Sequence, residues 1–196
     1  MKLFERWKAK KKSGKIFDIV FIILVVVSLI PPVRRELSSF VISLTLRSPK
    51  INEQAEDKTL PAEELQWELE NMQGEVFFLK EYTGKPVFLN FWATWCPPCR
   101  AEMPSIQKLY NTHKDNVQFI LVSYENKEVI MSFLESKGFE LPVYTSQYRA
   151  PDKIYSNSLP TTYIISSDGN VVLSHKGTAN WNSEKVNNLL NELSNK

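Results

Sequence analysis

The sequence predicts an α/β fold, in which a mixed central sheet is covered by helices on both faces and follows an N-terminal apolar segment. Three observations indicate this class. The 196 residues suit one domain with an appendage, and after about residue 65 the apolar pattern switches repeatedly between strand and helix periods. The run 87–92 is apolar throughout except for Asn90, which is typical of a central strand that is covered on both faces.

The expected elements follow one another along residues 65–196. Apolar residues that recur every three or four positions indicate helices, and short apolar runs between turn residues indicate strands. In chain order the elements are a hairpin over 67–80 that turns near Gly74, the central strand 87–92, a helix over 98–114, a strand over 117–122, a helix that ends at Gly138, a hairpin with strands 162–165 and 171–173, and a closing helix marked by Val186, Leu189, Leu190 and Leu193.

The N-terminus has the pattern of a membrane anchor. Residues 1–15 carry seven basic side chains against one acidic side chain, and the apolar run 16–30 follows them. The run does not end in the small residues of a cleavage site, which favours an uncleaved anchor over a removed signal peptide or a buried core helix. We therefore expect a cytoplasmic basic tail over 1–15 and a single transmembrane signal anchor over 16–33 in the cytoplasmic (inner) membrane, with the remaining chain in the periplasm.

Residues 34–64 are interpreted as a juxtamembrane segment and a tether. Residues 34–46 mix charges with apolar side chains, so they are expected to form a short helix along the membrane surface, or a second span too short to cross. From about Arg47 the composition becomes polar, with prolines as helix breakers. The globular domain is then expected over 65–196.

The charge distribution argues against nucleic acid as a partner. The whole chain has a net charge of +2, but residues 51–196 contain 13 basic against 19 acidic residues. Phosphate binding needs Lys and Arg clustered on the folded surface. The globular part is instead mildly acidic, so no nucleic-acid partner is expected.

The chain contains only two cysteines, Cys96 and Cys99. A single close pair does not form a structural disulfide framework, and a four-ligand zinc site lacks suitably spaced partners, because only His113 and His175 are available. No metal and no cofactor are therefore expected. The alternative to a reactive pair is two inert buried thiols.

The position of Cys96 favours reactivity. A cysteine directly after a buried strand and before a helix lies where free backbone N–H groups and the helix dipole stabilise a thiolate, the species that attacks disulfides. Cys96 is therefore the expected nucleophile, and Cys99, one helical turn further, is the expected resolving thiol. The two are expected to form a redox-active disulfide.

Pro97 and Pro98 are expected at the first two helical positions, which proline tolerates because the N–H group that it lacks would have had no partner there. These prolines also remove two possible donors to the Cys96 sulfur. The amide of Cys99 is then the main backbone donor left, so we expect a less stabilised thiolate. A protein that reduces its partners tolerates this better than one that oxidises them.

The segment 87–104, VFLNFWATWCPPCRAEMP, resembles the active-site segment of the TlpA/ResA-like branch of the thioredoxin superfamily. The likeness runs from about Trp67 to the C-terminus, and the chain's layout resembles anchored relatives from Bacteroidetes-type bacteria. It implies a thioredoxin fold and a membrane-anchored thiol:disulfide oxidoreductase that acts on protein disulfides outside the cytoplasmic membrane. The resemblance further implies reduction of its partners, in cytochrome c maturation or general thiol homeostasis, with electrons from a membrane thiol donor.

The resemblance also implies a substrate-binding edge opposite the cysteines. Pro160 corresponds to the cis-proline of the family, and its neighbours Leu159 and Thr161 complete the motif, with Leu159 offering backbone hydrogen bonds to an extended substrate. Gly177 matches a glycine that allows close approach by the substrate backbone. The alternatives are an ordinary trans proline and an ordinary turn glycine.

Four further residues are expected to support the cysteines. Asn90 replaces the buried Asp of thioredoxin and cannot titrate, so Glu102, three residues after Cys99 on the same helical face, is the nearest substitute for moving the Cys99 proton. The alternative for Glu102 is a solvated surface side chain. Trp92 and Trp95 are expected to pack around the disulfide and shape the contact surface, although Trp92 also suits a simple core role.

Three competing functions stay open at this stage. Net disulfide oxidation uses the same chemistry in the opposite direction. A thiol peroxidase shares the fold but normally has a proline before its reactive cysteine in a motif that 93–96 lacks. A copper-delivery module would need paired cysteines with a distal histidine, for which His175 is the late candidate.

Overall fold

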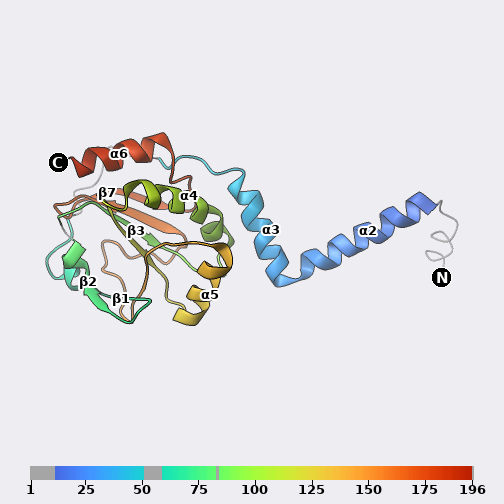
Figure 1. Ribbon diagram of the computed structural model, residues 1–196, viewed down its shortest axis with the longest axis horizontal. Coiled ribbons are helices and arrows are strands. Elements are labelled where there is room, and N and C mark those ends of the chain that lie inside the picture. Colours follow the sequence, from blue (N-terminus) through green and yellow to red (C-terminus); the bar gives the residue numbers. More distant parts are fainter. Residues whose placement is uncertain (1–11, 51–58, 83, 196) are drawn as a thin grey trace. The chain divides into compact units, whose positions relative to one another are not determined.

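The computed structural model describes residues 12–50, 59–82 and 84–195, so residues 1–11 of the predicted basic tail lie outside the described part. The chain divides into two compact units, with the boundary after Ser38. The first unit contains α2 (Lys12–Leu29) and the start of α3 (Pro31–Ser43) (Figure 1). Pro31 lacks the backbone N–H of a continuing helix, which explains the break. Within the described ranges, no helix is both long and apolar enough to span a membrane.

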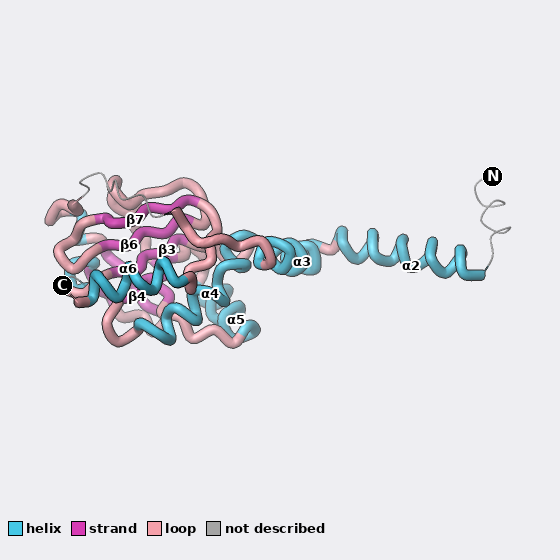
Figure 2. The backbone as a smooth tube through the Cα atoms, turned by 90° about the horizontal axis from the view of Figure 1, so that it is seen from above, coloured by secondary structure: helices cyan, strands magenta, loops and turns pink. Residues whose placement is uncertain are grey.

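The second unit is built on a seven-stranded sheet with the order β2-β1-β5-β4-β3-β6-β7. Figure 2 labels β7, β6, β3 and β4 of this sheet. β3, β4 and β5 are parallel to one another and all other neighbours are antiparallel, so the sheet is mixed as predicted. The strands are β1 (Glu68–Asn71), β2 (Val76–Phe78), β3 (Val87–Phe91), β4 (Gln118–Val122), β5 (Val143–Thr145), β6 (Thr161–Ile165) and β7 (Val171–Lys176). Of these, only β5 was not predicted.

The central strand β3 separates two apolar cores. Its side chains alternate, so that Phe88 faces one core and Leu89 and Phe91 face the other. All five β3 residues are buried, as the uninterrupted apolar run predicts. The end of β3 is therefore held rigidly from both faces, and the loop that follows it has a fixed starting point.

The α-helices of this unit all cover the same face of the sheet. They are α4 (Pro97–His113), α5 (Lys127–Lys137) and α6 (Glu184–Ser194), and their apolar residues share one core with Phe88. The other face is covered by the short 3-10 helices η1 (Glu64–Gln66) and η2 (Leu79–Tyr82) and by the loop after β5. Among the described residues of this unit, helices therefore cover both faces, but all three α-helices lie on one face and only 3-10 helices lie on the other. The connections β3-α4-β4 and β4-α5-β5 step in the same direction, and right-handed crossovers then place both helices on one face.

Part of the segment predicted as a tether packs on the second unit. Leu60 is 3% exposed in the core, and its amide donates to the carbonyl of Gly169 over 3.1 Å. The carbonyl of Arg47 accepts from the amide of Asn180 over 2.8 Å. Residues 51–58, also predicted as tether, lie outside the described residues. The core thus begins before residue 65, because one apolar side chain in a polar stretch is enough to fix that stretch to the sheet.

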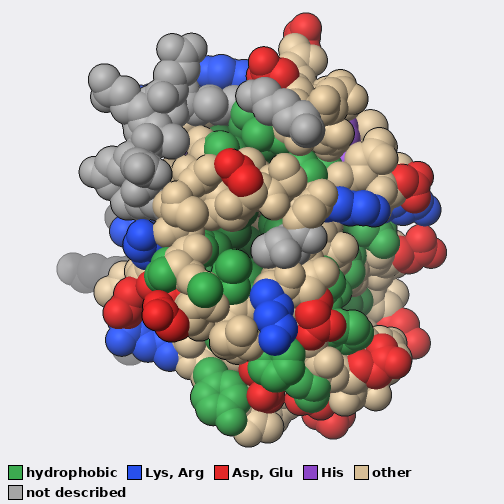
Figure 3. All heavy atoms as spheres, turned by 90° about the vertical axis from the view of Figure 1, so that its left-hand side faces the viewer, with side chains coloured by type: hydrophobic (Ala, Val, Ile, Leu, Met, Phe, Trp, Pro, Cys, Tyr) green, Lys and Arg blue, Asp and Glu red, His purple; other side chains and the backbone are tan. Residues whose placement is uncertain are grey.

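Charges of both signs are interspersed on the molecular face shown in Figure 3. On this face, no broad patch of Lys and Arg interrupts the mixture among the coloured residues.

Candidate active site

The cysteine pair lies at the junction of β3 and α4, where the sequence places it. Cys96 is the N-cap of α4 in an extended conformation, and Pro97 and Pro98 occupy the first two helical positions. The amide of Cys99 donates to the Cys96 sulfur over 3.3 Å. The expected backbone donor is therefore in place, at the end of a helix whose dipole favours negative charge on this sulfur.

Cys96 and Cys99 form a disulfide, with Cα atoms 5.3 Å apart. Cys96 is 4% exposed and Cys99 is fully buried. Of the two cysteines, Cys96 is therefore the one that has any surface open to solvent. This asymmetry matches the predicted division into an attacking and a resolving cysteine.

The segment that contains Pro160 lies at the same edge of the sheet as the cysteines. In the antiparallel pairing of β3 with β6, Phe91 stands opposite Thr161, which brings Leu159 and Pro160 beside the loop to Cys96. The Leu159–Pro160 peptide bond is cis, as the resemblance implies. The side chain of Leu159 is half-buried against both cores.

Gly177 and Thr161 fix the loop around Pro160. The amide of Gly177 donates to the carbonyl of Pro160 over 2.9 Å, and Gly177 has a φ of +99°, which a residue with a Cβ rarely adopts. A Cβ at Gly177 would have no atom within 4 Å, so the glycine is required for its conformation rather than for space. The hydroxyl of Thr161 donates to the carbonyl of Ser158 over 2.7 Å and therefore shapes this loop from inside.

Glu102 is fully buried on α4 rather than solvated, which excludes the alternative of a surface side chain. Its Oε1 accepts from the amide of Asn90 over 3.0 Å. Its Oε2 accepts from the indole of Trp181 over 2.9 Å and from the backbone amide of Ala179 over 3.2 Å. Burial raises the pKa of Glu102 from 4.5 to about 7, although these hydrogen bonds act in the opposite direction. Glu102 can thus gain or lose a proton near neutral pH.

Asn90 joins Glu102 to the strand that follows Pro160. Its amide nitrogen donates to Glu102 and, over 2.8 Å, to the hydroxyl of Thr162 on β6. The Asn90 Oδ1 atom is buried and has no hydrogen-bond partner. Asn90 therefore positions the carboxyl of Glu102 without titrating itself.

The two tryptophans of the motif have different surroundings. Trp92 is 1% exposed in the core that contains both cysteines, and its ring lies 5.6 Å from that of Phe133. Trp95 is 54% exposed directly before Cys96. Trp92 thus supports the disulfide from inside, whereas Trp95 offers an apolar surface beside the reactive sulfur.

Residues 54–193 match the protein family described as Redoxin. The chain belongs to the Redoxin family. This match covers more than half of the chain, including both cysteines and the Pro160 edge. The family assignment agrees with the fold and with the site geometry.

Two relatives with similar sequences are a ResA protein and a thioredoxin-like protein. The thiol-disulfide oxidoreductase ResA of Halalkalibacterium halodurans is 38% identical over 112 residues, 56% of this chain and 64% of that protein. The thioredoxin-like protein YneN of Bacillus subtilis is 33% identical over 114 residues, 56% of this chain and 67% of that protein. The chain therefore spans less than two thirds of that ResA. The predicted likeness to the TlpA/ResA branch is confirmed.

Solved structures confirm the thioredoxin-like fold. A thiol:disulfide interchange protein of the thioredoxin family from Chlorobium tepidum superposes with a TM-score of 0.55 at 24% identity, over 71% of this chain and 99% of that one. A DsbF homologue from Corynebacterium diphtheriae gives a TM-score of 0.57 at 20% identity, over 74% and 94% of the two chains. At these identities the likeness concerns the fold alone.

Sequence reasoning missed one acidic residue of this Redoxin site. Glu125 follows β4 and accepts from the backbone amide of Thr94 over 2.6 Å and from the Thr94 hydroxyl over 2.7 Å. Thr94 lies in the loop that leads to Cys96, and its carbonyl also accepts from Arg100 over 3.2 Å. The sequence signal that could have indicated Glu125 is its position just after β4, the strand parallel to β3, because functional side chains gather at the carboxyl ends of parallel strands.

Sequence reasoning also missed the loop that follows β7. Trp181 and Ala179 provide two of the three hydrogen bonds to the Glu102 carboxyl, yet they are more than 70 residues away in the chain. No local pattern in the sequence marks them. Only the return of the chain after β7 to the side of α4 brings them to the site.

The histidines have structural contacts in this Redoxin chain. His113 is buried, and its Nε2 lies 2.8 Å from the Asn187 side-chain oxygen. His175 packs edge-on against Trp181 with ring centroids 5.6 Å apart. Within the described ranges, no group of three or more His, Cys, Asp and Glu side chains is arranged to hold a metal ion.

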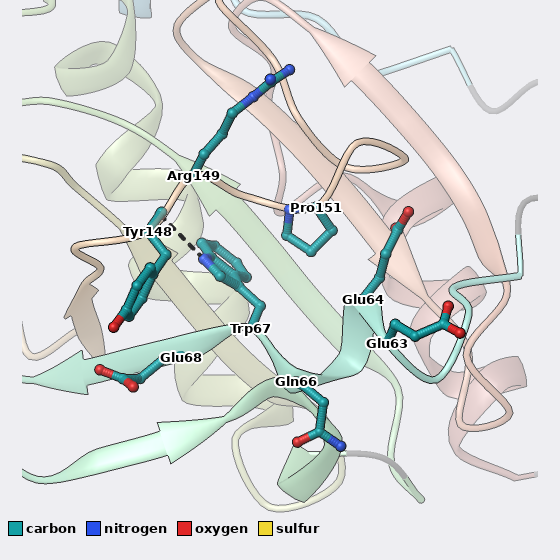
Figure 4. Close-up of a pocket in the computed structure, with 8 residues that line it drawn as sticks. All are labelled: Glu63, Glu64, Gln66, Trp67, Glu68, Tyr148, Arg149 and Pro151. Carbon is teal, nitrogen blue, oxygen red and sulfur yellow. Dashed lines mark hydrogen bonds between the residues drawn. The ribbon is translucent and has the colours of Figure 1, made fainter.

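A separate cavity of about 460 Å³ lies on the face of the sheet opposite α4 (Figure 4). Trp67 forms its inner wall and donates its indole hydrogen to the carbonyl of Tyr148 over 3.4 Å. The side chains of Glu63 and Glu64 lie on one side of the cavity. No cysteine is among the residues that line it, so this cavity is distinct from the disulfide site.

Proposed function

We propose that this chain is a thiol:disulfide oxidoreductase that acts on protein disulfides through Cys96 and Cys99. The observation that carries the proposal is the asymmetric disulfide at the start of α4, in which only Cys96 reaches solvent. The cis peptide before Pro160 lies beside it and offers an edge for an extended peptide. The relative from Halalkalibacterium halodurans is described as a thiol-disulfide oxidoreductase, which agrees with this activity.

In the reducing direction, the thiolate of Cys96 attacks one sulfur of a substrate disulfide. A mixed disulfide forms between Cys96 and the substrate, and the other substrate sulfur leaves as a thiolate that takes up a proton. Cys99 then loses its proton and attacks the Cys96 sulfur, which releases the second substrate sulfur as a thiol. The substrate gains two electrons and two protons, and the protein is left with its Cys96–Cys99 disulfide.

Glu102 is the proposed acceptor for the Cys99 proton. It lies three residues after Cys99 on the same helix and is held by Asn90 from the neighbouring strand. The pKa of Glu102, about 7, allows its carboxyl to exchange a proton near neutral pH. Glu102 thus accepts the proton that a titratable side chain at position 90 would otherwise accept, since Asn90 cannot titrate.

The proposed direction of reaction is reduction of the partner. With prolines at the first two helical positions, Cys99 supplies the one backbone N–H that is seen to donate to the Cys96 sulfur. A weakly stabilised thiolate raises the tendency of the pair to give up electrons. The oxidised pair then needs a thiol donor to restore it, for which we propose a membrane thiol protein. Cytochrome c maturation or general thiol homeostasis would use such a reductant.

We also propose that residues 16–33 attach the protein to the cytoplasmic membrane, with the N-terminus inside and the Redoxin domain in the periplasm. The seven basic residues among the first 15 support this orientation. A helix with so many apolar side chains open to its surroundings is costly in water. The exposed side chains on α2 are Ile16, Phe17, Ile19, Val20, Phe21, Ile22, Ile23, Val25 and Val27.

Membrane attachment is tested by alkaline carbonate extraction of cell membranes. The full chain is expected in the pellet and a variant without residues 1–33 in the supernatant. Equal release of both proteins would contradict the attachment and leave the chemistry of the cysteines untouched.

The activity and its partners are tested by trapping. Expressed as the full chain in its native host, Cys99→Ser should accumulate mixed disulfides between Cys96 and its substrates, because the resolving step is blocked. The matched control is Cys96→Ser/Cys99→Ser, which should trap nothing. If Cys99→Ser captures no more protein than this control, the proposed activity is wrong.

A further inference from the structure

We propose that Trp181 is a positioning residue of the redox centre, whose indole N–H fixes the carboxyl of Glu102, three residues after Cys99 on α4. The inference rests on the proposed role of Glu102. It adds a residue that lies 79 positions from Glu102 in the chain and outside the cysteine motif.

The contact is direct and excludes water. The indole nitrogen of Trp181 lies 2.9 Å from Oε2 of Glu102, and both side chains are fully buried. The same oxygen accepts from the amide of Ala179, whereas Oε1 accepts from Asn90. The carboxyl is therefore held by donors on both oxygens, with Trp181 supplying the shortest of the three bonds.

Trp181 is itself locked in place. Its ring packs edge-on against Phe88 with centroids 5.3 Å apart and against His175 with centroids 5.6 Å apart. Its backbone amide donates to the hydroxyl of Ser105 over 3.1 Å, and that hydroxyl donates to the Glu102 carbonyl over 2.7 Å. The residue thus fastens the loop after β7 to α4 through its side chain and through its backbone.

These contacts make the carboxylate form of Glu102 depend on Trp181. A buried carboxylate needs its donors, and loss of one donor favours the protonated form. The titratable groups nearest in the structure are Cys99, one turn before Glu102 on α4, and His175 on β7, which packs against the indole of Trp181. Asn90, which donates to the carboxyl, does not titrate. Burial lowers the pKa of His175, so this histidine brings no positive charge to the carboxylate at pH 7 and above.

The test is the pH dependence of thiol alkylation in the reduced full chain, between pH 5 and pH 9. The wild type is expected to show an inflection near pH 7 from Glu102, and Glu102→Gln should lack it. Trp181→Phe keeps an aromatic ring but lacks the N–H, and it should move this inflection upward by about one pH unit. In the double variant Glu102→Gln/Trp181→Phe, the profile should equal that of Glu102→Gln alone.

The matched control is Trp67→Phe. Trp67 is also buried, at 5% exposure, and also donates its indole N–H to an oxygen, but on the other face of the sheet. It should leave the inflection at its wild-type position. An equal displacement in both tryptophan variants would indicate a general loss of packing and overturn the inference.

The remaining outcomes separate the two proposals. If Glu102→Gln retains the inflection, the proposed role of Glu102 fails and the inference fails with it. If Glu102→Gln removes the inflection but Trp181→Phe leaves it unmoved, the inference alone is overturned. Should Trp181→Phe not fold, β-(3-benzothienyl)alanine at position 181 keeps the bicyclic shape without the N–H, and the same displacement is required.

Discussion

The side-chain amide of Asn90 donates to the carboxyl of Glu102 over 3.0 Å, with both side chains fully buried. Asn90 is on the central strand and Glu102 is on the helix that starts with the cysteine pair. Asn90, which cannot titrate, therefore holds the titratable carboxyl of Glu102 in place through a hydrogen bond. Behind the disulfide, the site is a hydrogen-bonded carboxyl rather than an isolated charge.

Glu102→Gln should change how stability depends on pH. The folded-state pKa of Glu102, about 7, lies above its ordinary value of 4.5, so the folded protein binds the extra proton between these values. Stability from this group is present at low pH and is lost as pH rises from about 4.5 to about 7, by about 3 kcal/mol at about 1.4 kcal/mol per pH unit. In Glu102→Gln this decline should be absent.

Chemical denaturation at pH 5 and pH 7.5 measures this effect. The wild type should lose more free energy of unfolding between the two pH values than Glu102→Gln does. Asn90 can turn its unpaired Oδ1 toward the new amide, so the variant is expected to fold. An identical loss in both proteins would show that Glu102 does not titrate in this range.

Glu125→Ala should loosen the loop before Cys96. The Glu125 carboxylate accepts two hydrogen bonds from Thr94, and their loss should destabilise the protein by about 1–3 kcal/mol and slow disulfide exchange several-fold. Exchange rates and urea unfolding check both effects. The control Glu128→Ala removes an exposed carboxylate from the start of α5 and should change neither.

The elements with local signals could be predicted from the sequence. The start of α4 follows from a cysteine cap and two prolines, and the end of α5 from Gly138, which adopts a left-handed conformation with φ of +66°. β5 has only three residues, too few for a period, and exists because β1 and β4 pair with it. The placement of all α-helices on one face required the strand order, which no local pattern reveals.

The residues of the site also differ in whether the sequence alone could locate them. Cys96, Cys99 and Pro160 belong to short motifs and could be located from the sequence. The burial of Glu102 could not, because it depends on Trp181 and Ala179 returning to α4 after β7. These contacts join segments far apart in the chain, so local patterns in a single sequence do not predict them.

Pro97→Ala should lower the pKa of the Cys96 thiol. The substitution restores a backbone N–H at the first helical position, next to the Cys96 sulfur, which accepts a hydrogen bond from the Cys99 amide. An added donor stabilises the thiolate, and the pKa should fall by about half a unit to one unit. Absorbance of the thiolate at 240 nm as a function of pH measures it.

Pro104→Ala is the control for this titration. Pro104 lies inside α4, where a restored N–H bonds within the helix and not to sulfur. The Cys96 pKa should stay at its wild-type value in Pro104→Ala. Equal pKa values in Pro97→Ala and wild type would show that the prolines do not control the thiolate.

The most direct test of the account is the rate at which the reduced full chain cleaves a peptide disulfide at pH 7. The account predicts a second-order rate constant at least about tenfold above that of a small free thiol, because the start of α4 stabilises the Cys96 thiolate. Cys96→Ser should abolish the reaction, and Cys99→Ser should stop it at the mixed disulfide. A wild-type rate no higher than that of the small thiol would contradict the account.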